Sequence, residues 1–147
     1  MPIMPDGKVV MVKMFRHATR SWCLEFPRGG IDAVGSIKKV LEQELKEEAG
    51  LQAGEMLSLG SMEPDTGILA QRVPVYLVRV VGEAGKAIPE YAEVITGLMF
   101  FTEPMLRAVL LAQEYDELQP DGTMRKYSVR GSFENFAYTQ AKMRGLI

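Results

Sequence analysis

The sequence contains a single cysteine, Cys23, and a single histidine, His17, among its 147 residues. One cysteine excludes an internal disulfide, and the two residues together are too few for a zinc site or any other site built on histidine and cysteine ligands. A metal site in this protein should therefore use oxygen ligands, which suit hard ions such as Mg²⁺ and Mn²⁺.

Excess charge and long apolar runs are also absent. The 17 Lys and Arg residues are nearly balanced by 19 Asp and Glu, and a net charge of −2 argues against a nucleic-acid polymer as partner while leaving a small nucleotide open. No apolar run reaches the 18 residues that a membrane-spanning helix needs, and residues 1–7 lack the pattern of a secretory signal. We therefore expect a cytoplasmic protein without a membrane partner.

Apolar segments separated by turn residues predict five strands and three helices. The strands are expected at residues 8–14, 22–26, 56–59, 73–81 and 94–101, the fourth of them apolar enough to be central. Helices are expected from Ser36 to Ala49 before Gly50, after Thr102 with a stripe of Met105, Leu106, Val109 and Leu110, and over residues 132–144. Without a repeat or a linker, this pattern predicts one mixed α/β domain over residues 1–147.

The first helix is the informative segment. A helical wheel places Glu44, Glu47 and Glu48 within or at the margin of its apolar arc, although an acidic run is ordinarily a solvated surface. Three carboxylates within one turn repel one another, and partial burial adds a desolvation penalty. A cation should therefore lie beside them: Arg or Lys would serve, and Mg²⁺ or Mn²⁺ would suit the oxygen ligands.

Residues 29–51 resemble the Nudix box, G-x5-E-x7-R-E-U-x-E-E-x-G-U, in which U is aliphatic. Gly29 matches the first glycine, and residues 44–51, ELKEEAGL, match the second half without a gap. Gly35 and Gln43 depart from the pattern, since they replace its first glutamate and its arginine. The resemblance to the Nudix (MutT-like) hydrolase superfamily implies an α/β/α sandwich with a mixed central sheet, and the two departures imply a slower reaction.

Resemblance beyond the box indicates a subfamily. The run WCLEFPRGG at residues 22–30 is similar to the W-x-x-E-x-P-x-G run of ADP-ribose and ADP-sugar pyrophosphatases, as are the loop at residues 64–67 and the closing helix at 132–147. This implies a Mg²⁺-dependent (or Mn²⁺-dependent) pyrophosphohydrolase that releases a nucleoside monophosphate and a phosphorylated sugar. The alternatives are a non-catalytic nucleotide-binding or regulatory Nudix domain and a nucleoside triphosphate housecleaning pyrophosphatase.

The resemblance also implies roles for individual residues. The metal ligands would be Glu44, Glu48, Glu47 and the backbone carbonyl of Arg28, with Glu47 also a catalytic candidate. A further catalytic glutamate would come from a loop after the box, as either Glu90 or Glu93. Contacts to phosphate, ribose or adenine would involve Arg28, Glu25 and Arg72, although Arg72 could equally be a surface residue.

Three further features carry expectations. Trp22 is expected to pack rather than to stack on a base, and Cys23 is expected to be a buried thiol. Residues 1–8 alone precede the first long strand, whereas the enzymes of the resemblance usually carry a longer segment that is used in dimerisation. If this chain forms a homodimer, we therefore expect the contact to be made through core surfaces such as its sheet edges or its final helix.

Overall fold

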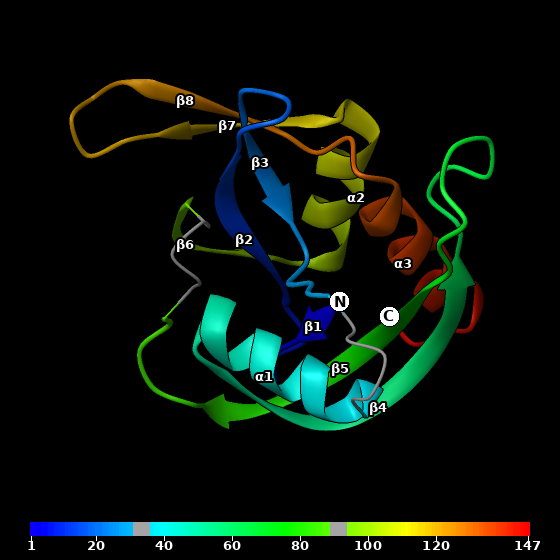
Figure 1. The fold of residues 1–147 in the computed structure, drawn as a ribbon. Coiled ribbons are helices and arrows are strands. Elements are labelled where there is room, and N and C mark those ends of the chain that lie inside the picture. Colours follow the sequence, from blue (N-terminus) through cyan, green and yellow to red (C-terminus); the bar gives the residue numbers. More distant parts are fainter. Residues whose placement is uncertain (31–35, 89–93) are drawn as a thin grey trace.

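The computed structural model describes residues 1–30, 36–88 and 94–147 (Figure 1). Its strands are β1 (Pro2–Ile3), β2 (Val9–Arg16), β3 (Ser21–Glu25), β4 (Leu51–Met62), β5 (Val73–Glu83), β6 (Val94–Phe101), β7 (Glu114–Leu118) and β8 (Met124–Ser128). Its helices are α1 (Ile37–Ala49), α2 (Glu103–Ala112) and α3 (Ser132–Met143). None of the helices in these three stretches is both long and apolar enough to cross a membrane.

The strands form one mixed sheet of eight strands. Their order is β4-β5-β1-β2-β3-β8-β7, and β6 pairs with β2 as well. The pairs β1–β5 and β3–β8 are parallel, and the other pairs are antiparallel. β5 is hydrogen-bonded on both sides, by β4 and β1, which confirms the expectation that this apolar strand is central.

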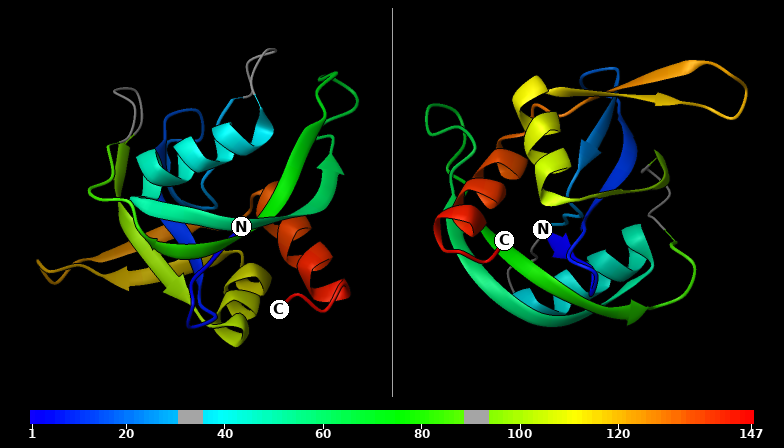
Figure 2. Two further views of the ribbon diagram at one scale, coloured as in Figure 1. Left: turned by 90° about the horizontal axis from the view of Figure 1, so that it is seen from below. Right: turned by 180° about the vertical axis from the view of Figure 1, so that it is seen from behind.

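Strand β2 shows how the helices cover both faces of the sheet. Its residues alternate between two hydrophobic clusters, since Val9 and Met11 belong to one and Val10 and Val12 belong to the other. The first cluster contains buried residues of α2 and α3, and the second contains residues of α1. Figure 2 shows the same arrangement, with α1 on one side of the sheet and α2 and α3 on the other. The expected α/β/α sandwich is therefore confirmed.

The predicted boundaries of α1 are confirmed. Ser36 stands at the N-cap without a side-chain capping hydrogen bond, and Gly50 ends the helix in the left-handed conformation with φ of 65°. Its N–H donates to the carbonyl oxygen of Lys46 at 2.9 Å. A Cβ at this position would collide with the carbonyl oxygen of Gly85, so close packing also requires glycine here. The end of α1 is therefore fixed against the segment that follows β5.

Several details differ from the sequence-based expectations. β4 is much longer than residues 56–59, and neither β1 nor the hairpin of β7 and β8 is predicted by apolar patterning. Met105, which the sequence predicts in the apolar stripe of α2, is 47% exposed. The buried residues of this helix are Leu106, Val109 and Leu110. The packing role of Trp22 is confirmed, since its ring contacts Phe15 and Tyr127 edge-on.

Candidate active site

A cavity of about 560 Å³ opens between α1, the segment after β3, β5 and α3. Its polar wall contains Arg16, Arg28 and Glu44, which come from β2, the segment after β3 and α1. Its apolar wall is lined by Val40, Leu41, Leu69, Tyr76, Phe133 and Ala137, among others. This combination of an extended apolar surface with a few charged groups is typical of a small-molecule site.

Glu44 lies directly against Gly29, the first glycine of the box. A Cβ at residue 29 would overlap the carboxyl group of Glu44, so no larger residue fits without moving that side chain. Both residues line the cavity. The glycine and the glutamate that the Nudix box places at a fixed spacing therefore contact each other directly at the cavity wall.

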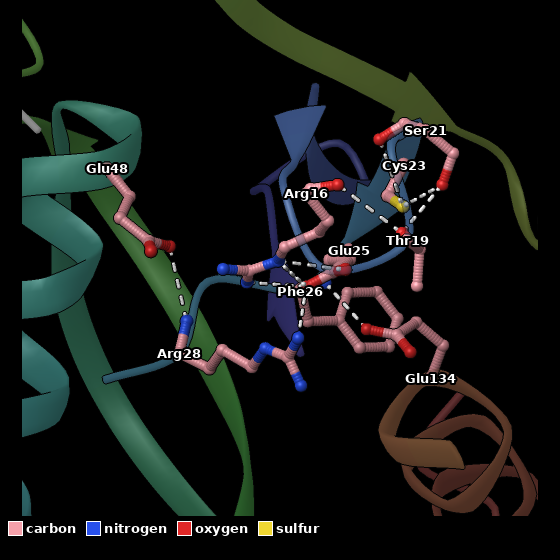
Figure 3. A network of polar contacts seen from close by, with 9 residues as sticks. All are labelled: Arg16, Thr19, Ser21, Cys23, Glu25, Phe26, Arg28, Glu48 and Glu134. Atoms are coloured by element: carbon pink, nitrogen blue, oxygen red, sulfur yellow. Dashed lines mark hydrogen bonds and ion pairs between the residues drawn. The ribbon is translucent and has the colours of Figure 1, made fainter. Parts of the chain in front are cut away.

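Glu48 lies one turn further along α1 and is only 1% exposed. Its Oε2 accepts a hydrogen bond from the backbone N–H of Arg28 at 3.2 Å, as Figure 3 shows. The prediction for Arg28 concerned its carbonyl oxygen, and the contact observed here is made by its amide. Glu44 and Glu48, spaced i and i+4, thus both lie against the segment that contains Arg28 and Gly29.

Glu25 organises the two arginines of the cavity. It is 8% exposed, and its carboxylate accepts hydrogen bonds from Arg16 at 2.7 and 3.2 Å while lying 2.6 Å from Nη2 of Arg28. The guanidinium of Arg28 also lies over the ring of Phe133, 5.0 Å from its centre. Glu25 thus holds two guanidinium groups at the cavity wall, and guanidinium groups are suited to bind phosphate.

Glu47 faces a different part of the surface. Its Oε1 accepts a hydrogen bond from Nε2 of Gln43 at 2.9 Å, and both residues line a shallow hollow together with Lys39, Lys46 and Lys86. The structure thus brings together Glu44, Glu48, Arg28 and Glu25, whereas Glu47 lies to the side of them. Its part in metal binding or catalysis stays a prediction.

The other predicted site residues have separate positions. The side chain of Arg72 is 73% exposed and pairs with Glu63 at 3.0 Å. This arrangement supports the alternative that Arg72 is a surface residue. Glu90 and Glu93 lie outside the described residues. The backbone N–H of Ile88 donates to the carbonyl oxygen of Glu47 at 2.8 Å, which attaches Ile88 to the end of α1.

A divalent cation such as Mg²⁺ requires several oxygen ligands. Glu44, Glu48 and backbone oxygens of the adjoining segment are the hard oxygen donors that Mg²⁺ and Mn²⁺ prefer, and Gly29 provides the space in which the Glu44 carboxylate lies. Within residues 1–30, 36–88 and 94–147 no group of three acidic, histidine or cysteine side chains forms a complete metal cluster. The donor set therefore fits such an ion if further ligands come from substrate, water or another glutamate.

Arg16 is the functional candidate that sequence reasoning missed. It stands at the end of β2, and its side chain joins Glu25 and lines the cavity. The signal was an arginine at the end of a mostly apolar strand, directly before the turn to the strand that ends at Glu25. Pairing of the two strands as a hairpin would have brought the residues onto adjacent strands.

Comparison with known proteins identifies the family of this chain. The sequence profile of the NUDIX domain matches residues 2–103, most of the chain, and the protein belongs to the Nudix family. It is 28% identical over 131 residues to the ADP-ribose pyrophosphatase of Mycobacterium tuberculosis, covering 87% of this chain and 63% of that protein. The chain thus spans less than two thirds of the length of this curated relative.

Solved structures confirm the fold. One, described as an ADP compounds hydrolase, superimposes with a TM-score of 0.73 at 18% identity and covers 99% of this chain and 72% of its own. Another, a NUDIX hydrolase from Nitrosomonas europaea, gives a TM-score of 0.69 at 14% identity and covers 97% and 86%. Nudix hydrolases generally use divalent metals and act on small nucleotide substrates.

Proposed function

We propose that the protein is a Mg²⁺-dependent (or Mn²⁺-dependent) pyrophosphohydrolase that cleaves a nucleoside diphosphate linked to a second group. ADP-ribose or an ADP-sugar is the proposed substrate, and the products are a nucleoside monophosphate and a phosphorylated sugar. One observation carries the proposal: Glu44 of the Nudix helix and a pair of arginines line the same cavity, and Glu48 of that helix binds the backbone N–H of one of these arginines, Arg28. The name of the Mycobacterium tuberculosis relative supports the choice of substrate.

The arginines would bind the pyrophosphate. Arg28 is held by Glu25 and by the ring of Phe133, and Arg16 is held by Glu25, so both guanidinium groups are oriented before substrate arrives. Preorganised donors need no rearrangement to stabilise the charge that develops during hydrolysis. The nucleoside and sugar would lie on the apolar wall that includes Leu69 and Tyr76.

Glu44 and Glu48 would hold the metal ion together with the carbonyl oxygen of Arg28. When bound, the ion neutralises pyrophosphate charge and lowers the pKa of a water molecule. The attacking water forms a bond to one phosphorus, and the bond from that phosphorus to the bridging oxygen breaks, so that the other half leaves as a phosphomonoester. A glutamate accepts the proton of this water, and Glu47, Glu90 and Glu93 are the proposed candidates.

Product analysis tests the proposal. The purified protein is incubated with Mg²⁺ and with ADP-ribose, ADP-glucose, diadenosine polyphosphates and nucleoside triphosphates in turn, and the products are separated by chromatography. We expect AMP and a sugar phosphate from the first two substrates. The Glu48→Gln variant should lose most of this activity, whereas Glu42→Gln, on the exposed side of the same helix, should retain it.

Two outcomes would contradict the proposal. Release of pyrophosphate from nucleoside triphosphates, with the ADP compounds left intact, would indicate a housecleaning enzyme. Tight nucleotide binding in calorimetry without any product would indicate a non-catalytic domain, the alternative that the departures at Gly35 and Gln43 suggest. We further propose that residues 1–147 act as one Nudix domain, and a cytoplasmic location stays a prediction from the sequence.

A further inference from the structure

Glu134 is a buried carboxylate to which the reaction proposed above assigns no role. It lies in the first turn of α3, is 1% exposed, and its Oε1 accepts a hydrogen bond from the backbone N–H of Phe26 at 3.1 Å. Its Oε2 has no hydrogen-bond partner among the described residues. Burial raises the pKa of this carboxyl group, because the charged form loses its hydration. Burying a carboxyl group with one oxygen unpaired costs free energy, so its presence here indicates a role for the contact with Phe26.

The contact with Phe26 is one of a pair. Figure 3 shows the chain after β3 passing between two buried glutamates, with Glu48 on one side and Glu134 on the other. Glu48 accepts the N–H of Arg28, and Glu134 accepts the N–H of Phe26. Because Pro27 has no amide hydrogen, these are the two backbone N–H groups of the segment Phe26–Arg28. Both are therefore bound by buried carboxylates from different helices.

Helix α3 contacts Arg28 by a second route as well. Phe133, the residue before Glu134, lies under the guanidinium of Arg28 and lines the cavity. One turn of α3 thus contacts both the backbone that leads into Arg28 and the side chain of Arg28. A shift of this turn would move the proposed phosphate contact and the proposed carbonyl ligand together.

We propose that Glu134 is a positioning residue of the metal and phosphate site, acting through the amide of Phe26. This inference rests on the proposed function. The competing explanation is that Glu134 serves α3 alone, because it lies in the first helical turn and its carboxyl group occupies the space beside Gly131, where a Cβ would overlap it. The two explanations differ in what they predict for the cavity.

Three substitutions separate the explanations. Glu134→Gln keeps an oxygen that can accept the N–H of Phe26 and should behave like the unsubstituted protein. Glu134→Asp keeps an acidic residue in the first turn of α3 but is shorter by one methylene, so it should lose the contact with Phe26. Glu134→Leu removes both. Ala141→Gly, at a fully buried position further along α3, is the matched control that weakens the helix without touching Phe26.

Two readouts are needed, one of which does not depend on turnover. Steady-state kinetics with ADP-ribose and Mg²⁺ should show kcat/KM reduced on the order of 10- to 100-fold in Glu134→Asp and Glu134→Leu, the size expected from a modest misplacement of reacting groups. Calorimetric titration with Mg²⁺ alone should show several-fold weaker binding in the same two variants. Glu134→Gln and Ala141→Gly should stay within about twofold in both measurements, even where urea unfolding shows that Ala141→Gly is less stable.

Unchanged kcat/KM and unchanged Mg²⁺ affinity in Glu134→Asp would overturn the inference and leave Glu134 as a helix-capping residue. If Glu134→Leu does not fold, Glu134→Asp decides. If the unsubstituted protein hydrolyses none of the substrates, the proposed function fails, and the Mg²⁺ titration still decides the role of Glu134.

Discussion

The carboxylates of α1 combine negative charge with burial. Glu48 is 1% exposed, and Glu44 fills the space left by the missing side chain of Gly29. A cation that binds both would relieve their repulsion, which is why a pattern of acids on an apolar arc already indicated a metal site. Charge and spacing along one helix are properties that a sequence displays directly.

Removal of either charge should therefore weaken metal binding. Glu44→Gln and Glu48→Gln are expected to lower the affinity for Mg²⁺ by at least about tenfold, the loss typical of changes even in the outer shell of a metal site. Isothermal titration calorimetry measures this directly. An unchanged affinity in both variants would contradict the assignment of the ligands.

Glu48→Gln should not destabilise the metal-free protein. Glu48→Gln removes a buried charge but keeps an oxygen that can accept the N–H of Arg28, so its stability in EDTA is expected to equal or exceed that of the unsubstituted protein. Urea unfolding in EDTA measures the difference. A clear loss of stability there would show that Glu48 is required for folding rather than for metal binding.

The orientation of Glu47 marks the limit of prediction at this scale. Its angle about the helix axis places it at the margin of the apolar arc, and such an angle does not reveal which element covers that margin. The structure turns it toward Gln43 and away from the cavity. Arg16 was missed for the same reason, because the position of its side chain at the cavity depends on Glu25, a residue on the neighbouring strand.

At the scale of elements, the hairpin of β7 and β8 is the largest feature that apolar patterning did not predict. Its strands carry charged and polar residues, with an alternating pattern of half-exposed and exposed positions in β7. The turn sequence Pro120-Asp121-Gly122 between them was the available signal. By contrast, α1, α2, α3 and β6 were predicted closely, because a long apolar period or a clear cap marks each of them.

A polar network attaches this hairpin to β2. Burial alone would raise the pKa of Glu117, but hydrogen bonds from Lys13 at 2.9 Å, from Gln119 at 3.0 Å and from Tyr127 at 2.9 Å hold it below the ordinary value of 4.5. The ionised carboxylate therefore stabilises the fold above pH 4.5, and this contribution disappears as the pH falls through the lowered pKa.

Glu117→Gln should accordingly lower the free energy of unfolding by about 1 kcal/mol at neutral pH, a value kept small because both partners are partly exposed. The difference from the unsubstituted protein should shrink as the pH is lowered below 4.5. Urea unfolding at a series of pH values measures it. A difference that stays constant with pH would contradict the role of the charge.

We expect the two departures from the Nudix box, at Gly35 and Gln43, to affect the orientation of α1. Gly35 lies outside the described residues, and Gln43 makes its contact within the helix, to Glu47. If both positions lost the ion pair of the family pattern together, restoring one charge should be neutral or harmful, because it has no mate. The Gly35→Glu/Gln43→Arg double variant should exceed both single variants in kcat/KM.

A double-mutant cycle measures this coupling directly. Additive effects at the two positions would show that the protein orients its helix by other residues. Stability measured alongside identifies any variant whose lower activity reflects unfolding.

At the scale of the whole molecule, the site joins parts that are distant in sequence. α1, the segment after β3 and α3 all contribute to it, so a ligand that bridges them should stabilise the entire domain. Mg²⁺ at about 100 times its dissociation constant is expected to add about 2.7 kcal/mol, which corresponds to roughly 5 to 10 °C in Tm. Differential scanning calorimetry with Mg²⁺ and with EDTA measures the shift. An equal shift in Glu48→Gln would contradict binding at this site.

The association of two copies is a separate proposal. In the part of the chain that the structure describes, β4, β6 and β7 each pair with one strand, so the other side of each has no strand partner. A homodimer formed through such an edge or through α3 should show twice the monomer mass in static light scattering at tens of micromolar. The monomer mass under these conditions would contradict it.

The two carboxylates that hold the segment Phe26–Arg28 come from the first and the last helix, which has a consequence for synthesis. A ribosome adds roughly 5 to 20 residues per second, so α3 emerges on the order of 10 s after α1. During this interval the amide of Phe26 lacks its acceptor, and β2 gains its partner β6 only about midway through the same period. The nascent chain thus carries a complete Nudix motif for some seconds before it can carry a working site.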